Sequence, residues 1–309
     1  MPNYQGVWSL STQFQNAGNW PSPPPPLALF SGGNTGLTVN TIEQVSILTA
    51  ANASDFGDLS KTQQNTGSLG SATRAVISLD AGTLEYVEFA TAGNSTDFGD
   101  SNFTTGDAFT LSSNSTRGLI ASGSDYSNQI DYITIASTGN ATDFGDNNIA
   151  WRYGGATASS TRSLMFGGAI SGSSQVNNIS YVTIASTGNA ADFGDLTQAR
   201  YFVTGVSSPT RSVFNGGTNG TPVNTIDYVE TATLGNATDF GNMTQTKNGG
   251  SAASSTTIAL FGGGYTGSAY SNVIDFITFT SIGNATDYGD LTAAKYGLSA
   301  CSNGHGGLS

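Results

Sequence analysis

The stretch Gly235-Asn-Ala-Thr-Asp-Phe-Gly-Asn-Met-Thr244 is one of six near-copies of a single phrase in this 309-residue chain. Each copy contains an aspartate, an aromatic residue and a glycine, and the first aspartates lie at positions 55, 97, 143, 192, 239 and 287. Successive copies are therefore 42, 46, 49, 47 and 48 residues apart. A period in this range is typical of a repeat architecture, in which every repeat folds as one supersecondary unit.

A single repeat contains four short segments with strand chemistry. In the unit from Ala199 to Thr244 these segments cover residues 201–206, 211–217, 224–231 and 238–244. The second segment ends in the pair Gly216-Gly217, which permits the positive φ of a tight turn. Four antiparallel strands in about 47 residues are typical of a propeller blade.

The number of strands at the two ends of the chain predicts how the ring closes. Five complete repeats run from Lys61 to about Leu291. Strands two to four of a further repeat lie between Leu27 and Leu59, and a first strand lies between Lys295 and Ser302. We therefore predict an all-β fold, a six-bladed β-propeller over residues 27–309 with four antiparallel strands per blade. The N- and C-terminal strands would share one blade, which places residues 27 and 302 close in space.

The repeated phrase itself is predicted to form a tight turn, with the aspartate carboxylate accepting local N–H groups and the glycine taking an unusual φ. We expect its aromatic side chain to point between neighbouring blades, where burial gives roughly 1.5–3 kcal/mol. These predicted blade-packing aromatics are Phe56, Phe98, Phe144, Phe193, Phe240 and Tyr288.

Other interpretations of the phrase are less favoured. A kinase-type Asp-Phe-Gly needs a catalytic loop and a β3 lysine motif, and the sequence has neither. Calcium binding stays an alternative, because Asn236 and Asp239 supply oxygens, although no EF-hand spacing exists. Triplets such as Asn140-Ala-Thr142 also fit glycosylation in a secreted protein. We expect no metal and no cofactor.

The nine basic residues follow the repeat. We predict that they make repeated structural pairs, mainly with nearby aspartates, and form no binding patch. Four follow a threonine at the start of the second strand, and five open the first strand: Arg74, Arg117, Arg162 and Arg211, then Lys61, Arg152, Arg200, Lys247 and Lys295.

Composition excludes several functions. The formal charge is −12, so nucleic acid binding is not expected, because phosphate affinity needs clustered cations. No apolar run approaches the about 20 residues of a membrane span, so we expect no membrane insertion. Residues 1–11 lack the pattern of a signal peptide. The single cysteine, Cys301, excludes a disulfide framework and is expected to be a small apolar strand residue.

Residues 1–26 stand outside the repeat and are predicted to form an extended attachment arm. The run from Pro23 to Pro26 favours a stiff polyproline II conformation. Tryptophan is a frequent interface anchor, so we expect this arm to dock onto another protein. Packing against the propeller is the alternative. The expected docking residues are Val7, Trp8, Leu10, Trp20 and Pro21.

The glycine pair and the aromatics of the third and fourth strands resemble a degenerate kelch repeat. More specifically, the unit from Ile130 to Asp146 resembles kelch-like β-propeller proteins of tailed phages that infect marine cyanobacteria. The segments 6–10, 18–21 and 303–308 share this resemblance. It implies a virion structural protein, either a tail-fibre or receptor-binding component or a capsid decoration, with no catalytic residues. The implied partners are other virion proteins, bound through the arm, and a host-surface glycan or protein.

Enzyme and adaptor functions compete with this interpretation. A copper-radical oxidase needs two histidines, and the chain has only His305. A sialidase needs converging arginines, whereas here they recur around the ring. An acid-pair glycosidase stays open, since Asp131, Asp227 and Asp275 could face one surface. A cellular kelch-type adaptor is also less favoured. We predict a non-enzymatic protein whose contact loops include residues 169–177 and 218–224.

Overall fold

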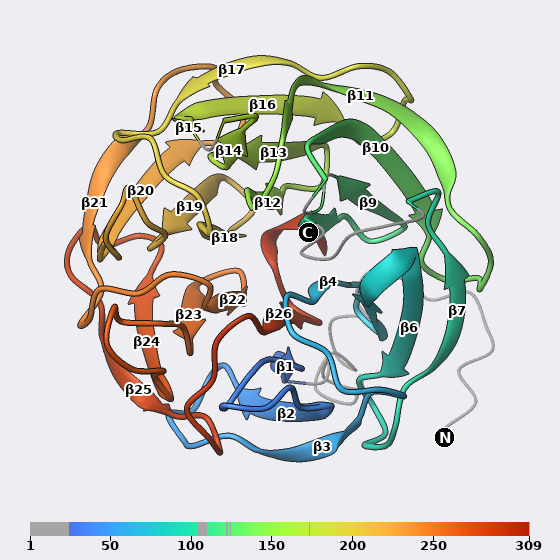
Figure 1. Ribbon diagram of the computed structural model, residues 1–309, viewed down its shortest axis with the longest axis vertical. Coiled ribbons are helices and arrows are strands. Elements are labelled where there is room, and N and C mark those ends of the chain that lie inside the picture. The colour runs from blue at the N-terminus through green and yellow to red at the C-terminus, as the bar shows by residue number, and fades with distance from the viewer. Residues whose placement is uncertain (1–24, 104–109, 122, 124, 173, 309) are drawn as a thin grey trace, which may run out of the picture.

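The computed structural model describes residues 25–103, 110–121, 123, 125–172 and 174–308. Within these residues, six sheets of four antiparallel strands surround a central axis (Figure 1). The six-bladed all-β propeller predicted from the repeats is confirmed. In each blade the first strand lies nearest the axis and the fourth strand forms the outer edge (Figure 1).

The strands of each blade are given from the axis outward. Blade 1 contains β26 (Ser299–Ser302), β1 (Leu27–Ser31), β2 (Thr41–Ser46) and β3 (Ser54–Asp58), and blade 2 contains β4 (Gly67–Gly70), β5 (Arg74–Ser78), β6 (Thr83–Glu88) and β7 (Thr96–Asp100). Blade 3 contains β8 (Thr110–Ser113), β9 (Arg117–Ala121), β10 (Ser127–Thr134) and β11 (Thr142–Trp151). Blade 4 contains β12 (Gly155–Ala158), β13 (Arg162–Phe166), β16 (Asn178–Thr183) and β17 (Ala191–Asp195). Blade 5 contains β18 (Thr204–Ser207), β19 (Arg211–Asn215), β20 (Thr225–Glu230) and β21 (Thr238–Asn242). Blade 6 contains β22 (Ser251–Ser254), β23 (Ile258–Gly262), β24 (Val273–Thr278) and β25 (Thr286–Asp290). A two-stranded hairpin, β14 (Ala169–Ile170) with β15 (Ser174–Gln175), and the 3-10 turns η2 (Asp80–Gly82) and η3 (Gly306–Leu308) lie outside these sheets.

Blade 1 closes the ring with strands from both ends of the repeat region, as predicted. Strand β1 pairs with β26, and Ala28 lies opposite Ser302. The backbone N–H of Leu27 donates to Oδ1 of Asn303 at 2.7 Å. Because β26 is hydrogen-bonded into this sheet, opening the ring requires removing a strand from a blade.

The first strands consist largely of small residues, which lets six of them converge on the axis. Serine side chains link their ends. The hydroxyl of Ser302 donates to the carbonyl oxygen of Ser254, and the hydroxyl of Ser254 donates to the carbonyl oxygen of Ser207. The Ser207 hydroxyl donates in turn to the carbonyl oxygen of Ala158. These bonds tie neighbouring blades together at one end of the channel.

The apolar core is divided into six clusters within the described residues, and each lies between two neighbouring blades. Phe193 of β17, for example, packs with Phe214 and Val229 of the next blade. Every aromatic side chain expected to pack between blades is buried in one of these clusters: Phe56, Phe98, Phe144, Phe193, Phe240 and Tyr288.

Second-strand arginines join neighbouring blades. In blade 5 the guanidinium of Arg211 lies 4.5 Å from the ring centroid of Tyr228, which contacts Phe240 edge-on. Its Nη1 also donates to the carbonyl oxygen of Phe279 in the next blade at 2.6 Å. Arg74, Arg117 and Arg162 repeat both contacts.

The predicted pairing of these four arginines with aspartates is wrong. Arg74 and Arg211 pair with Glu88 and Glu230 on the third strand of their own blades. Arg117 and Arg162 donate to backbone carbonyls of the next blade. Because a carbonyl oxygen is present at every residue, its use as an acceptor leaves no signal in the sequence.

The prediction that the Asp-aromatic-Gly phrase forms a tight turn is also wrong. In every repeat it lies in the outer strand, and its first aspartate is exposed. The glycine is required because the next blade passes directly over it. At Gly99, whose φ is 137°, an added Cβ would lie 2.6 Å from the carbonyl oxygen of Gly139 in the next blade. Packing between blades therefore decides the conformation of this phrase.

The asparagine of each repeat bonds to the outer strand of the preceding blade. Oδ1 of Asn236, for example, accepts the N–H of Asp195 at 3.1 Å, and the N–H of Ala237 donates to the carbonyl oxygen of Asp195. The side-chain oxygen that was a candidate calcium ligand is therefore used between blades. The equivalent asparagines are Asn52, Asn94, Asn140, Asn189 and Asn284.

Cys301 lies buried in β26, in the cluster around Phe56. Burial raises the pKa of its thiol to about 12, and a hydrogen bond with Ser68 opposes this rise. The thiol is therefore protonated at neutral pH and behaves as a small apolar side chain. Among the described residues, no helix is long and apolar enough to span a bilayer.

The C-terminal segment crosses the end of the channel after β26, and the end of the chain lies at the centre of the ring (Figure 1). Nε2–H of His305 donates to the carbonyl oxygen of Gly70 at 2.9 Å, and its Nδ1 accepts the N–H of Gly307 at 3.1 Å. Both bonds require a neutral imidazole with the proton on Nε2.

This requirement predicts a loss of stability in acid. Burial lowers the pKa of His305, and the bond to Gly70 opposes the shift. A group whose pKa is lowered by folding stabilises the folded state fully above its unfolded pKa, which is about 6.5 for histidine. This stabilisation is lost as the pH falls through the pKa of the folded state. We expect His305→Gln, which keeps a neutral donor, to lose less thermal stability than the native chain between about pH 7.5 and 5. Differential scanning fluorimetry at several pH values measures this, and parallel curves for the two proteins would contradict it.

Candidate functional site

The two faces of the ring are built from different loops. The linkers between blades and the loops between second and third strands lie on one face, which we call the linker face. The turns between first and second strands, the loops between third and fourth strands and residues 303–308 lie on the other. The C-terminal segment covers the channel there, so the open end of the channel is on the linker face.

A series of backbone hydrogen bonds links five residues around this open end, which we call the mouth; the position between blades 2 and 3 falls in 104–109, outside the described residues. The N–H of Phe202 donates to the carbonyl oxygen of Tyr153, and the N–H of Gly249 donates to that of Phe202. Gly297 and Asn65 continue the series across blades 1 and 2. All five residues have φ between 53° and 67°. In this conformation Phe202, Gly249 and Gly297 each donate to the residue on one side and accept from the residue on the other.

Two of these left-handed positions carry bulky aromatic residues. Tyr153 has φ 56° and Phe202 has φ 53°, whereas Gly249 and Gly297 fill equivalent positions. A non-glycine residue costs about 1–2 kcal/mol in this conformation. The two rings stack with centroids 4.3 Å apart. Glycine would make the same backbone hydrogen bonds without strain, so the fold alone does not explain these aromatics. Strained residues cluster at functional sites.

Further aromatic residues continue the patch outward from the mouth. The ring of Tyr296 lies edge-on to Phe202, with centroids 6.0 Å apart, and covers Gly249. Tyr270 stacks nearly parallel to Tyr296 at 6.1 Å, and Tyr265 contacts both tyrosines edge-on. The side chain of Tyr270 is 37% exposed.

These residues line a groove of about 670 Å³ over blades 5, 6 and 1, which we call the aromatic groove. Its size lies in the range typical of ligand sites, about 300–1,000 Å³. The groove contains aromatic rings, a proline and uncharged polar groups, and none of its lining residues is charged: Tyr201, Phe202, Thr218, Gly220, Thr221, Pro222, Asn248, Tyr265, Gly267, Tyr270 and Tyr296.

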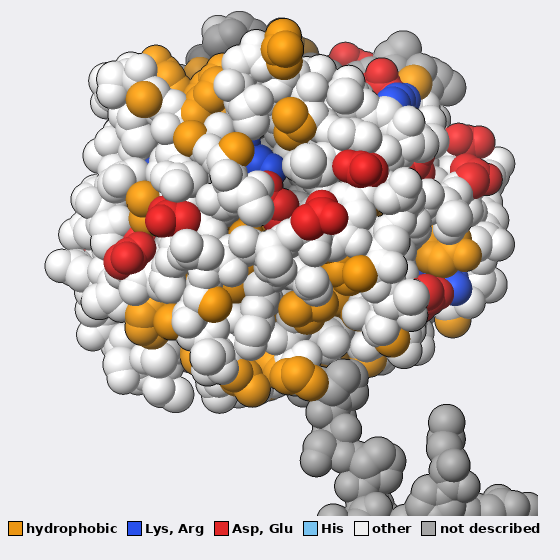
Figure 2. Space-filling model, turned by 90° about the horizontal axis from the view of Figure 1, so that it is seen from below, with side chains coloured by type: hydrophobic (Ala, Val, Ile, Leu, Met, Phe, Trp, Pro, Cys, Tyr) orange, Lys and Arg blue, Asp and Glu red, His pale blue; other side chains and the backbone are white. Residues whose placement is uncertain are grey.

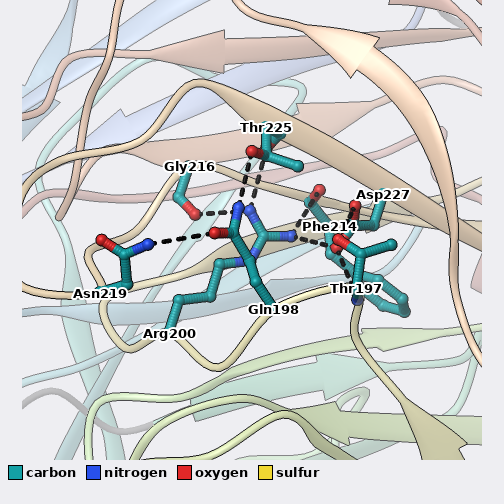
Figure 3. Close-up of polar contacts among 8 residues, drawn as sticks. All are labelled: Thr197, Gln198, Arg200, Phe214, Gly216, Asn219, Thr225 and Asp227. Atoms are coloured by element: carbon teal, nitrogen blue, oxygen red, sulfur yellow. Dashed lines mark hydrogen bonds and ion pairs between the residues drawn. The ribbon is translucent and has the colours of Figure 1, made fainter.

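A buried arginine holds the linker that carries Tyr201 and Phe202 (Figure 3). Arg200 is fully buried and donates from Nη2 to Oδ2 of Asp227 at 2.8 Å. Its Nη1 donates to the carbonyl oxygens of Gly216 and Thr225 at 2.8 and 3.0 Å. Burial lowers the pKa of this guanidinium, and Asp227 opposes the shift. The linker is thereby fixed to the second and third strands of its own blade.

Equivalent linker residues make comparable pairs in other blades. Lys247 pairs with Asp275 at 3.0 Å, and Lys295 pairs with Glu43. Both pairs are buried, and burial lowers the pKa of the Lys247 amine, while Asp275 opposes this. Lys61 pairs with Asp80 at the surface.

Arg152 differs from the other linker residues, because it lies over the ring of Tyr126 with its guanidinium carbon 4.4 Å from the centroid. The prediction of pairing with aspartate therefore holds for Lys61, Arg200 and Lys247, while Lys295 uses a glutamate.

The three aspartates considered for an acid-pair glycosidase do not face a surface. Asp131, Asp227 and Asp275 are each 0% exposed. Asp131 accepts two hydrogen bonds from Asn102, and the other two pair with buried cations. These carboxylates therefore hold linkers in place, and substrate cannot reach them as they stand. No cluster of three His, Cys, Asp or Glu suited to a metal occurs among the described residues.

The predicted contact segments have different outcomes. The loop at 218–224 lies beside Tyr201 and contributes Thr218, Thr221 and Pro222 to the aromatic groove. The loop at 169–177 forms the β14–β15 hairpin. The expected docking residues Val7, Trp8, Leu10, Trp20 and Pro21 lie outside the described residues.

The aromatic groove is not among the features predicted from the sequence. A signal was present, because the residue two positions after the linker cation is glycine at Gly154, Gly249 and Gly297 but phenylalanine at Phe202. The left-handed conformation of those positions is visible only once the ring has formed. No protein-family model matches the sequence, and no curated protein matches it.

Proposed function

We propose that this chain is a non-enzymatic virion protein that displays its propeller on a phage particle and contacts the host surface through the linker face. The observation that carries the binding role is the preformed aromatic groove beside the strained mouth. Phe202 is held by the backbone hydrogen bonds around the mouth and by the buried Arg200–Asp227 pair, which fixes its linker. A site that is ordered before binding loses little conformational entropy when the ligand arrives.

The surface chemistry supports display in an aqueous environment. On the edge of the ring shown in Figure 2, most of the surface is backbone or side chains that are neither charged nor hydrophobic, with acidic and hydrophobic side chains scattered among them. The net charge of −12 favours solubility and disfavours nucleic acid as a partner. The virion assignment rests on the resemblance of the repeats to kelch-like phage propellers, and capsid decoration is the alternative position. A cellular kelch-type adaptor is the third candidate.

Attachment through the N-terminal arm is the part of this proposal that is tested in particles. We expect a chain without residues 1–26 to fold as a monomer and to be absent from purified particles, as measured by mass spectrometry. A Trp8→Ala/Trp20→Ala chain of full length should show the same loss, because it removes only the anchors. Normal incorporation of both variants would contradict arm-mediated attachment, and absence of the native chain from particles would contradict the virion assignment.

The same particles allow the position of the protein, on the tail or on the head, to be measured. Antibody labelling of intact virions, observed by electron microscopy, should mark the tail if the chain is a fibre component. Labelling spread over the head would instead support capsid decoration. As a control, Tyr270→Ala should be incorporated normally, since this side chain lies in the aromatic groove and outside the arm.

A further inference from the structure

We infer that the aromatic groove binds a neutral glycan, with sugar rings stacked on Phe202, Tyr270 and Tyr296. This inference rests on the proposed contact with the host surface and names the chemistry of that contact. It follows from three features of the groove: aromatic rings along its lining, with Tyr270 exposed and Phe202 and Tyr296 half-buried, uncharged hydrogen-bonding groups, and retained backbone strain.

The aromatic faces suit the apolar side of a pyranose ring. Sugar C–H bonds carry partial positive charge and pack favourably against the negative face of an aromatic ring. Tyr270 and Tyr296 lie at 14° to each other with centroids 6.1 Å apart, so they present two nearly parallel planes. Phe202 provides a third ring closer to the mouth. A chain of several sugar units can contact successive rings along the groove.

The polar groups around the rings suit sugar hydroxyls. Thr221 and the half-buried Asn248 line the groove and carry neutral donors and acceptors. Asn219 lies exposed at its edge and donates to Oε1 of Gln198 at 3.1 Å, which fixes the amide with its oxygen pointing away from Gln198 (Figure 3). A few oriented polar groups beside apolar faces are typical of sites that recognise uncharged polar ligands.

The absence of charge among the lining residues selects neutral sugars over sulfated or carboxylated ones. The nearest linker cations, Arg200, Lys247 and Lys295, are buried and already paired with carboxylates. An anionic sugar would therefore lose hydration without gaining an ion pair. The negative net charge of the chain adds long-range repulsion.

Because Phe202 is strained, its replacement by glycine distinguishes a role of the ring in binding from a role in the fold. Phe202→Gly relieves a positive φ and removes a half-buried ring, so these effects on stability oppose each other. If the ring serves binding, the variant keeps its melting temperature within about 3 °C and loses glycan affinity. If the ring serves the fold, the variant melts well below the native chain.

The binding experiment uses the native full-length chain with cellohexaose, maltohexaose and mannohexaose, and with hexagalacturonate as the anionic comparator. Saturation-transfer NMR detects binding and titration calorimetry gives Kd. We expect at least one neutral hexasaccharide to bind, and hexagalacturonate to bind more weakly. Tyr270→Ala should weaken the neutral ligand by about tenfold, as for a truncated anchor residue.

Matched variants separate stacking from other effects. Tyr270→Phe keeps the ring and should retain affinity within about twofold. Leu234→Ala removes an exposed apolar side chain on the opposite face and should change nothing. No binding of any neutral hexasaccharide, preference for hexagalacturonate, or full affinity in Tyr270→Ala would each overturn the inference. Those results leave incorporation into particles unaffected, whereas absence from particles overturns the virion assignment and leaves the binding data standing.

Discussion

Asp227→Ala should lower the free energy of unfolding by about 3–5 kcal/mol, because it leaves the guanidinium of Arg200 buried without its counter-charge. Arg200 is fully buried, and its other contacts are carbonyl oxygens, which do not neutralise it. Equilibrium unfolding in guanidinium chloride, followed by circular dichroism, measures the loss.

Two further variants assign this loss to the unpaired charge. Arg200→Met/Asp227→Leu removes both charges and should recover most of the stability, since apolar replacements of buried ion pairs are often neutral or better. Lys61→Ala breaks an exposed pair of the same class and should cost less than about 1 kcal/mol. A small loss in Asp227→Ala, or a double variant no more stable than the single one, would show that the pair does not support the blade.

The same pair connects the fold to the aromatic groove. Arg200 directly precedes Tyr201 and Phe202, and it bonds to carbonyls of β19 and of Thr225 in β20. Loss of Asp227 therefore removes the anchor of the segment that places the Phe202 ring. In the variant, glycan affinity should fall even under conditions in which the protein remains folded.

The architecture could be predicted because its causes are local and repeated. A period near 47 residues, paired glycines and the strands left over at the two ends define six blades and their closure. The burial of Phe144 or Phe193 follows from an aromatic residue that recurs at one place in each repeat. The repeat also predicted that Lys247 and its equivalents make structural pairs, although it predicted only aspartate as the partner type and no particular residue.

The remaining features depend on contacts between repeats. Asp and Gly favour turns in isolation, but Gly99 lies in a strand because Gly139 of the next blade packs over it. Asn236 suggested calcium or glycosylation, whereas its partner is a backbone N–H in the preceding blade. The positive φ of Tyr153 and Phe202 opposes their own preferences and is imposed by the backbone hydrogen bonds around the mouth. The candidate site therefore could not be predicted from the sequence of single repeats, because contacts between repeats form it.

Phe193→Ala and Phe144→Ala should each lower the free energy of unfolding by about 3–5 kcal/mol, the cost of removing a buried phenylalanine and leaving a cavity. Each ring is 2% exposed and contacts a tyrosine edge-on, Tyr181 and Tyr132 respectively. Leucine at either position keeps much of the volume and should cost less than alanine. Thermal and chemical unfolding measure both series, and an unchanged melt in both alanine variants would exclude the aromatic as a blade contact.

The Phe144→Ala/Phe193→Ala double variant tests whether the two blade interfaces stabilise the ring independently. Phe144 lies between blades 3 and 4, and Phe193 lies between blades 4 and 5, in separate clusters. Losses at independent sites add to within about 0.5 kcal/mol, provided that the interfaces do not communicate. Because closure by β26 holds blade 1 together, weakening two interfaces should not open the ring at either one. We therefore expect additive losses with a single unfolding transition, and two separate transitions would show that blades unfold independently.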